Sequence, residues 1–147
     1  SVLNKLKSNL QRLTAYNLFS APKKLLKNAG LSRQKIEYLK ILSEKFVRCP
    51  SFFYGFKHME DEEVITKLCE LKGIGEWTAQ MYLMFQLNRP NIMPMGDIGF
   101  INSAKRIYKI KEPVNENIIK ISKKWGNYKT IAVWYIWRIT DPEVVQY

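Results

Sequence analysis

The chain has 147 residues, enough for one domain with a buried core, and its 46% hydrophobic and 25% charged residues are ordinary for a globular protein. Its 24 Lys and Arg against 13 Asp and Glu give a formal net charge of +11, which predicts a polyanionic partner. A surface of solvated lysines is the alternative, and charge alone does not separate the two. The two cysteines, Cys49 and Cys69, are too few for an iron–sulfur cluster or a disulfide framework.

Two further features indicate the cellular compartment of the protein. The low cysteine content fits a reducing compartment. No apolar run approaches the roughly 20 residues that a membrane-spanning helix requires, and no signal peptide is recognisable. We therefore expect an intracellular protein with no membrane partner, in the cytoplasm of a prokaryote or the nucleus of a eukaryote.

Apolar residues recur at helical spacing through the first half of the chain. Leucines three or four residues apart predict an amphipathic helix over residues 3–13. A short helix is expected over 22–30, because a glycine at its end is a common stop signal. Ser32 is a suitable N-cap for a third helix. After an aromatic-rich connection over 49–59, the acidic residues 60–63 carry the charge that the first turn of a helix favours.

The second half of the chain is predicted to be helical as well. The helix that follows residue 76 has little polar face, so we expect it to be buried. Further helices are expected to begin at Asp97 and Pro113. Residues 131–137 are all apolar, and we favour helix over strand there because no partner strand is visible. The sequence therefore predicts one compact all-α domain over residues 1–147.

One segment joins two of these helices through a pair of glycines: Leu71-Lys72-Gly73-Ile74-Gly75-Glu76-Trp77-Thr78-Ala79. Glycine is needed where the backbone takes a positive φ or approaches another molecule closely, so we expect a tight helix–turn–helix. The free N–H groups and the dipole at the start of the second helix favour an anion. In so basic a chain the expected anion is a nucleic-acid phosphate, and an ordinary glycine turn is the alternative.

A second segment of interest is Met95-Gly96-Asp97-Ile98-Gly99. An aspartate before an apolar-periodic run is a common N-cap, and taken alone the segment favours that structural role. The helix dipole also keeps a carboxylate in this place ionised. An ionised carboxylate suits a reaction that builds positive charge on a sugar, as glycoside hydrolysis does. Both interpretations use the same position, so the sequence leaves them open.

Four tryptophans are core residues by default, since aromatic side chains at helical spacing usually pack: Trp77, Trp125, Trp134 and Trp137. Aromatic faces can also stack on a base that is turned out of a duplex. Neither the single histidine nor the methionines indicate a reaction, and no zinc-ligand spacing, P-loop or dinucleotide fingerprint is present.

Four segments, taken in order, resemble the helix–hairpin–helix DNA glycosylases, in particular the 3-methyladenine or alkylbase type. They are the two segments above, Trp125-Gly126-Asn127-Tyr128-Lys129, and Ala132-Val133-Trp134-Tyr135-Ile136-Trp137-Arg138. Gly30-Leu31-Ser32 with Lys35 and Tyr38-Leu39 also matches that branch. The resemblance runs from about residue 20 to about residue 140.

The resemblance implies a glycosylase of base excision repair, a monomer that removes alkylated purines such as 3-methyladenine from duplex DNA. The aspartate that family members use in base excision falls on Asp97, where it would stabilise the sugar cation and help water attack C1′. Base-pocket aromatics fall on Trp77 and Trp137. A further pocket position, aromatic in some relatives, falls on Met81, with Tyr82 beside it.

The resemblance also assigns binding functions to the hairpin. Its residues Lys72, Gly73, Ile74 and Gly75 would bind the DNA backbone near the lesion. Family hairpins often hold a monovalent cation, Na+ or K+, through main-chain carbonyls, which here fall at Cys69, Leu71 and Ile74. No other cofactor is implied.

One position decides between two subclasses of these enzymes. Members that also nick the strand carry a nucleophilic lysine two residues after the second hairpin glycine, and here that residue is Trp77. Because a tryptophan cannot form a Schiff base, the resemblance implies a monofunctional enzyme that leaves an abasic site and has no lyase activity.

The N-terminal segment departs from the family pattern. The family's glutamine-containing turn, which wedges into the gap left by the flipped base, is not recognisable in residues 1–20. Either an N-terminal part of the family domain is missing, or Asn9-Leu10-Gln11 is a diverged remnant of that turn. The departure keeps open a non-catalytic module that binds damaged or intact duplex DNA. A helical protein-interaction domain with incidental charge is the third interpretation, and salt would not weaken its binding.

Overall fold

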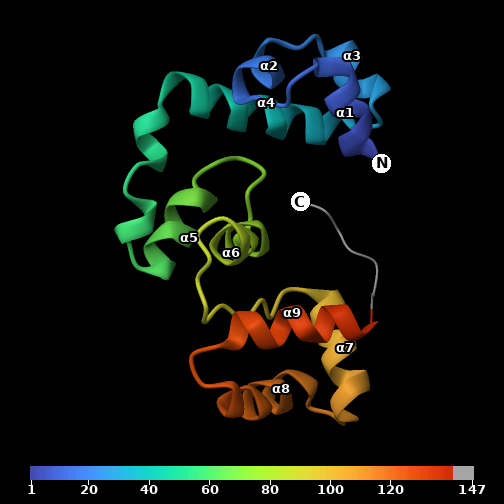
Figure 1. Ribbon diagram of the computed structural model, residues 1–147, viewed down its shortest axis with the longest axis vertical. Helices are drawn as coiled ribbons and strands as arrows, with labels where there is room; N and C mark the ends of the chain where they lie inside the picture. Colours follow the sequence, from blue (N-terminus) through green and yellow to red (C-terminus); the bar gives the residue numbers. More distant parts are fainter. Residues whose placement is uncertain (141–147) are drawn as a thin grey trace. The chain divides into compact units, whose positions relative to one another are not determined.

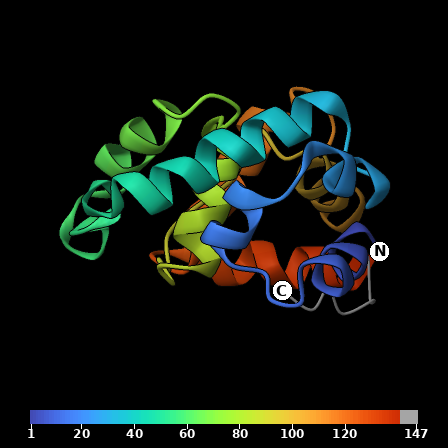
Figure 2. The same ribbon diagram turned by 90° about the horizontal axis from the view of Figure 1, so that it is seen from above.

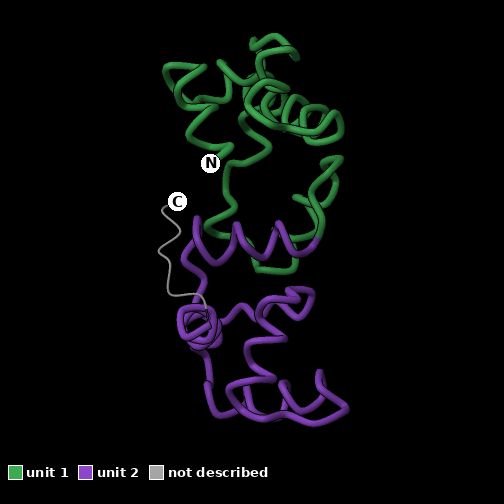
Figure 3. Tube along the Cα trace, turned by 90° about the vertical axis from the view of Figure 1, so that its right-hand side faces the viewer, with its two compact units in different colours: residues 1–75 green, residues 76–147 purple. Residues whose placement is uncertain are grey.

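The computed structural model describes residues 1–140, and this part of the chain consists of helices and turns without a strand (Figure 1). The all-α prediction is confirmed. The chain divides into two compact units, one of residues 1–75 and one that begins at Glu76 (Figure 3). Within the described residues, no helix combines the length and the apolar character that crossing a bilayer requires.

The first unit holds five α-helices and two 3₁₀ turns: α1 (Val2–Leu10), α2 (Ala15–Ser20), α3 (Lys23–Asn28), α4 (Arg33–Arg48), η1 (Pro50–Phe53), η2 (Phe56–His58) and α5 (Asp61–Cys69). Their ends follow the expected capping rules. Ser32 Oγ accepts a hydrogen bond of 3.2 Å from the Lys35 N–H at the start of α4. Glu60 and Glu63 form a capping box at the start of α5.

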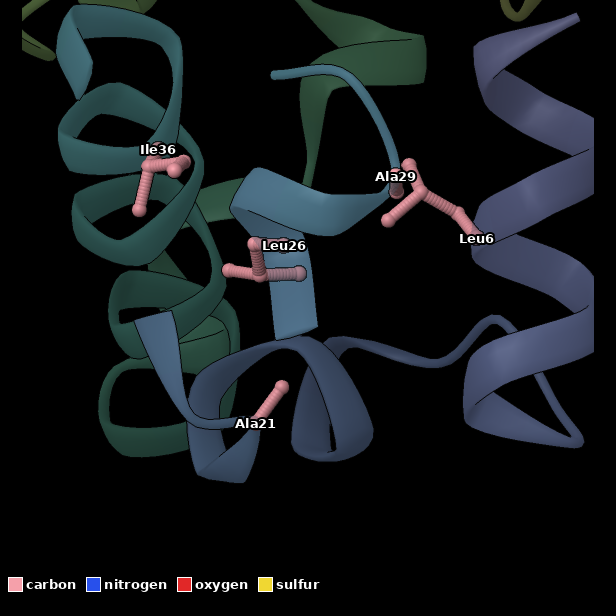
Figure 4. Packing of buried hydrophobic residues seen from close by; sticks show 5 residues of the cluster. All are labelled: Leu6, Ala21, Leu26, Ala29 and Ile36. Atoms are coloured by element: carbon pink, nitrogen blue, oxygen red, sulfur yellow. The ribbon is translucent and has the colours of Figure 1, made fainter. Parts of the chain in front are cut away.

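One hydrophobic cluster of the first unit lies where α1, α3 and α4 meet (Figure 4). Five buried side chains converge there: Leu6, Ala21, Leu26, Ala29 and Ile36 (Figure 4). Helix α4 packs against α2 and α3, and Figure 2 shows both beside it. Lys40 of α4 donates to the carbonyl oxygens of Phe19, at 2.5 Å, and Ala21. It therefore satisfies acceptors at the C-terminal end of α2, and burial lowers the pKa of its ammonium.

The second unit contains α6 (Glu76–Phe85), α7 (Ile98–Tyr108), α8 (Val114–Ser122), η3 (Lys123–Trp125) and α9 (Lys129–Thr140). Helix α7 packs against both α8 and α9 (Figure 1). The apolar run 131–137 lies within α9, as predicted, with Val133 and Ile136 buried and Ile131 exposed. Ser103 of α7 and Thr140 of α9 share a hydrogen bond of 2.7 Å between their hydroxyls.

Three expectations about these helices are wrong. The first helix ends at Leu10, where Gln11 takes a φ of 58°, and the short α2 that follows was not predicted. Helix α6 is not buried throughout, because Glu76, Trp77 and Thr78 in its first turn are exposed. Trp77 and Trp134, expected in the core, are 48% and 43% exposed. Apolar composition identified these segments as helices but did not show which faces pack.

Candidate active site

Asp97 occupies the N-cap of α7, and two donors fix its carboxylate. Oδ1 accepts the backbone N–H of Phe100 at 2.5 Å, which is the capping bond of the helix. Oδ2 accepts the indole Nε1–H of Trp77 at 2.7 Å. The side chain is half-buried, so it is anchored by the fold yet reachable from solvent. The capping role and the predicted chemical role therefore coexist in one residue.

The loop that leads to Asp97 is tied to the start of α9 by Thr130. The Thr130 hydroxyl donates to the carbonyl oxygen of Arg89 at 2.6 Å and accepts the N–H of Ile92 at 2.9 Å. Its backbone N–H donates to the carbonyl oxygen of Pro90 at 2.9 Å. Ile92 itself is buried. These three bonds hold the connection between α6 and α7 against a second helix, so Asp97 lies at the end of a fixed loop.

The predicted base-pocket residues lie on α6 and α9. Trp77, Met81 and Phe85 are four residues apart and therefore share one side of α6. The ring of Trp137 stacks on Phe85, with centroids 6.1 Å apart and an angle of 22° between the planes. Tyr82 is half-buried, and burial raises the pKa of its hydroxyl.

The structure thus brings Trp77 to Asp97 and Trp137 to Phe85, and α6 connects the two pairs. Among the described residues, the Asp97 carboxylate has hydrogen bonds with Phe100 and Trp77 and none with Trp137. Phe85, which stacks on the predicted pocket residue Trp137, was not among the pocket residues predicted from the sequence. Its i, i+4 relation to Met81 is the signal that would have found it.

The hairpin belongs to the first unit, and Gly73 is its critical residue. Gly73 has a φ of +91°, and a Cβ placed on it would lie 2.1 Å from Cγ of Tyr38. The turn therefore rests directly on the Tyr38 ring, which only glycine allows. A Cβ on Gly75 would meet no atom within 4 Å. The backbone at Gly75 is thus open to another molecule, as the predicted phosphate contact requires.

Lys72, the predicted phosphate ligand of the hairpin, pairs with an acidic residue of α4. Its Nζ lies 2.6 Å from Oε1 of Glu37, and both side chains are exposed. The hydrogen bond and charge of Lys72 lower the pKa of the Glu37 carboxyl, and those of Glu37 raise the pKa of Lys72. The sequence did not reveal Glu37, because the two residues are 35 positions apart.

The carbonyls expected to hold a cation lie at the hairpin. The Leu71 carbonyl accepts the N–H of Ile74 at 3.0 Å, which closes the turn and leaves that oxygen one lone pair. Carbonyl oxygens suit a hard cation, so the donor set of Cys69, Leu71 and Ile74 fits Na+ or K+ chemically. Among the described residues, no group of three His, Cys, Asp or Glu side chains could hold a metal ion.

The segment considered as a wedge remnant forms an exposed turn. Gln11 ends α1 with a positive φ of 58°. The Asn17 side-chain amide donates to the carbonyl oxygens of Leu10, at 3.3 Å, and Arg12, at 2.9 Å. The turn is thus held in one conformation by the helix that follows it.

The all-helical fold, the glycine hairpin and the tryptophan-bound aspartate define a helix–hairpin–helix protein of the DNA-repair class. A family model described as HhH-GPD superfamily base excision DNA repair protein matches residues 1–127, and the chain belongs to this family. The match includes the N-terminal residues that the resemblance left out, and it ends before α9 begins at Lys129.

Similar proteins share this fold. The 3-methyladenine DNA glycosylase of Schizosaccharomyces pombe, solved in complex with abasic DNA, superposes with a TM-score of 0.82 at 27% identity, covering 99% of this chain and 72% of that one. A DNA-3-methyladenine glycosidase of Bacillus halodurans gives a TM-score of 0.77 at 29% identity, covering 95% of this chain and 66% of that one.

Sequence comparison agrees with the structural one. DNA-3-methyladenine glycosylase 1 of Schizosaccharomyces pombe is 32% identical over 117 residues, which are 78% of this chain and 51% of that protein. The chain spans between 40% and 61% of the length of three curated relatives that it matches.

Proposed function

We propose that this chain is a monofunctional DNA glycosylase that hydrolyses the N-glycosidic bond of alkylated purines in duplex DNA and leaves an abasic site. The observation that carries the proposal is the 2.7 Å hydrogen bond from Trp77 Nε1 to Asp97 Oδ2. It joins an exposed aromatic face to an anchored carboxylate in a protein of the base excision family. An aromatic surface for a flipped base and a charge for a sugar cation are the two parts that base removal needs.

Asp97 would act on the deoxyribose as the base leaves. The electron pair of the C1′–N bond departs with the base, and positive charge develops on the sugar ring. A carboxylate held by Phe100 N–H and Trp77 Nε1–H is already oriented, so it stabilises that charge without reorganising. Each oxygen keeps lone pairs, and one can accept the proton of the water that bonds to C1′. A base already cationic from alkylation leaves readily, so modest catalysis suffices.

Because residue 77 is a tryptophan, the proposed reaction is hydrolysis without lyase activity. A lyase would need an amine at this position to attack C1′, and the indole nitrogen donates its proton to Asp97 instead. The exposed ring, 48% accessible, is free to stack on a base. Met81, Tyr82 and Trp137 complete the base pocket in this proposal.

The hairpin would hold the duplex. Lys72, Gly73, Ile74 and Gly75 contact backbone phosphates, and a Na+ or K+ ion on the Cys69, Leu71 and Ile74 carbonyls would add positive charge to the turn. The enzyme acts as a monomer on damaged duplex DNA, in the compartment that contains the genome. That is the cytoplasm of a prokaryote or the nucleus of a eukaryote.

A panel of modified duplexes tests the proposal. The protein is incubated with duplexes that carry 3-methyladenine, 7-methylguanine or 1,N6-ethenoadenine, and abasic sites are then cleaved with alkali. We expect alkali-dependent breaks at one or more lesions and none without alkali. Breaks without alkali would show lyase activity. Tight, salt-dependent binding with no breaks on any lesion would instead identify a DNA-binding module without activity.

A further inference from the structure

A pocket of about 410 Å³ lies on the first unit beside α3 and the start of α4. Six residues line it: Lys23, Lys24, Lys27, Arg33, Ile36 and Glu37. Ile36 is buried and the five charged residues are exposed, so the pocket has an apolar base beneath a charged rim. The aliphatic stems of the lysines can line its walls while their ammonium groups stay at the opening. We refer to it as the α3–α4 pocket.

The rim of the α3–α4 pocket carries four positive charges and one negative charge. Within residues 1–140, none of the four cations has a carboxylate at salt-bridge distance. Glu37, the single acid of the rim, directs its carboxylate to Lys72 of the hairpin at 2.6 Å. The pocket therefore has a net positive charge, and no salt bridge from the described residues pairs with its four cations, which favours an anion.

Glu37 also connects the pocket to the hairpin. Its carboxyl is under the electrostatic influence of Lys72 first, and then of Arg33 and Lys23. One carboxylate thus lies between the cations of the pocket and the cation of the turn. A polyanion that reached both places would find positive charge on each side of Glu37, with phosphate groups as its repeating ligand.

We propose that the α3–α4 pocket binds a backbone phosphate of the same DNA that the hairpin holds, at a position further along the strand. The proposal rests on the proposed function, because it takes DNA as the ligand. Free phosphate would bind the same cations, but it would not involve Lys72, which Glu37 connects to the pocket. Glu37 acts here as a competitor: it occupies Lys72 until a phosphate replaces it.

The test compares two double variants that each lose two exposed lysines of the first unit. Lys23→Gln with Lys27→Gln removes two cations from the pocket, and Lys5→Gln with Lys7→Gln removes two from α1, which does not line it. Binding to an intact, undamaged duplex is measured by fluorescence anisotropy over a range of salt. We expect the pocket variant to bind about tenfold more weakly and its salt slope to fall by about 1, with less than about a twofold loss in the control.

Glu37→Gln should change duplex affinity in the opposite direction. It should bind the duplex more tightly, by about threefold or more, because it removes a competitor of phosphate for Lys72. Glu44→Gln is its control, since Glu44 is on the same helix and pairs with Arg48 instead. Equal losses in the two lysine double variants, or equal gains in the two glutamate variants, would overturn the proposal.

Pyrophosphate serves as the probe for the other source of phosphate. If it saturates the wild-type protein in a ³¹P NMR titration while the lysine double variants bind duplex equally, the pocket takes a free phosphate and the DNA assignment is wrong. Because the assay uses undamaged duplex, it does not depend on base release. A wild-type protein that fails the lesion panel yet shows the predicted difference would overturn the glycosylase proposal alone.

Discussion

The hairpin at Gly73 and the start of α7 at Asp97 are both turns that precede a helix, but they are held in different ways. Gly73 is fixed by shape, because its Cα hydrogen faces the Tyr38 ring and its φ is +91°. Asp97 is fixed by side-chain hydrogen bonds to Phe100 and Trp77. Substitution should therefore damage the fold at the first turn and the chemistry at the second.

The difference separates two kinds of functional residue. At Gly73 and Gly75 the proposed DNA contact is made by the backbone, so at these two positions a side chain would only interfere. At Asp97 the side chain is the proposed reagent, and the backbone serves to place it. Substitution of Gly73 should lower stability more than activity, whereas substitution of Asp97 should lower activity more than stability.

The largest effect is expected for Asp97→Asn. The amide can still accept the Phe100 N–H, so the cap and the fold are retained, but the charge that would stabilise the sugar cation is lost. We expect base release in single-turnover assays to fall by at least about a hundredfold. Duplex affinity should change by less than about twofold. An equal loss of affinity and activity would show that Asp97 serves DNA binding and not catalysis.

Gly73→Ala should be the most destabilising of these variants. A Cβ at 2.1 Å from Tyr38 Cγ must displace the ring or the turn, and alanine is strained at this φ. We expect a loss of about 2–4 kcal/mol in the free energy of unfolding, measured by urea denaturation. Gly75→Ala is the matched control, since its Cβ meets open space. It should keep its stability and lose duplex affinity, and unchanged affinity would contradict the proposed backbone contact.

Trp77→Phe tests the hydrogen bond between the Trp77 indole and the Asp97 carboxylate. The ring is kept, but the Nε1–H donor to Asp97 Oδ2 is removed. We expect base release to slow by about three- to tenfold while duplex affinity stays the same, since a bond to a charged group contributes about 1.5–3 kcal/mol when shielded and less when exposed. Trp134→Phe is the control, because Trp134 is similarly exposed on α9. Similar rates for both variants would remove the positioning role of Trp77.

The smallest effect concerns the ion pair of the hairpin. The Glu37 carboxyl should titrate below its ordinary pKa, because Lys72 favours its ionised form. The pair thus adds stability above the unfolded-state pKa, and that stability is lost as pH falls through the lower folded-state pKa. In Lys72→Gln the Glu37 pKa should rise, which an NMR titration of the carboxyl carbon measures. The same pKa in both proteins would show that the pair does not persist in solution.

Local features of the fold were predictable from the sequence because they depend on neighbours within four residues. Ser32 and Asp97 as N-caps, and the acidic first turn of α5, follow from the capping rules. The helix α2 was missed because it has only six residues and no buried side chain of its own, so it carries no amphipathic signal.

Contacts between distant residues were not predictable. Tyr38 under Gly73, Glu37 on Lys72 and Thr130 on the α6–α7 connection each join segments that spacing rules do not relate. The packing rule also failed to predict the exposure of Trp77, although the family resemblance placed this residue in a base pocket. A partly exposed aromatic side chain departs from the rule that aromatic residues pack in the core. Departures of this kind are expected where a protein binds a ligand.

The three bonds of Thr130 determine how a nucleotide can reach Asp97. A connection fastened at Arg89, Pro90 and Ile92 cannot swing over a substrate as a lid would. Under the proposed function, a damaged nucleotide would therefore move the whole distance itself, because the Asp97 carboxylate is already held in position. Selectivity would then come from how easily a weakened base pair opens and not from closure of the protein. The amide proton of Ile92 should accordingly exchange slowly, at the same rate with and without DNA.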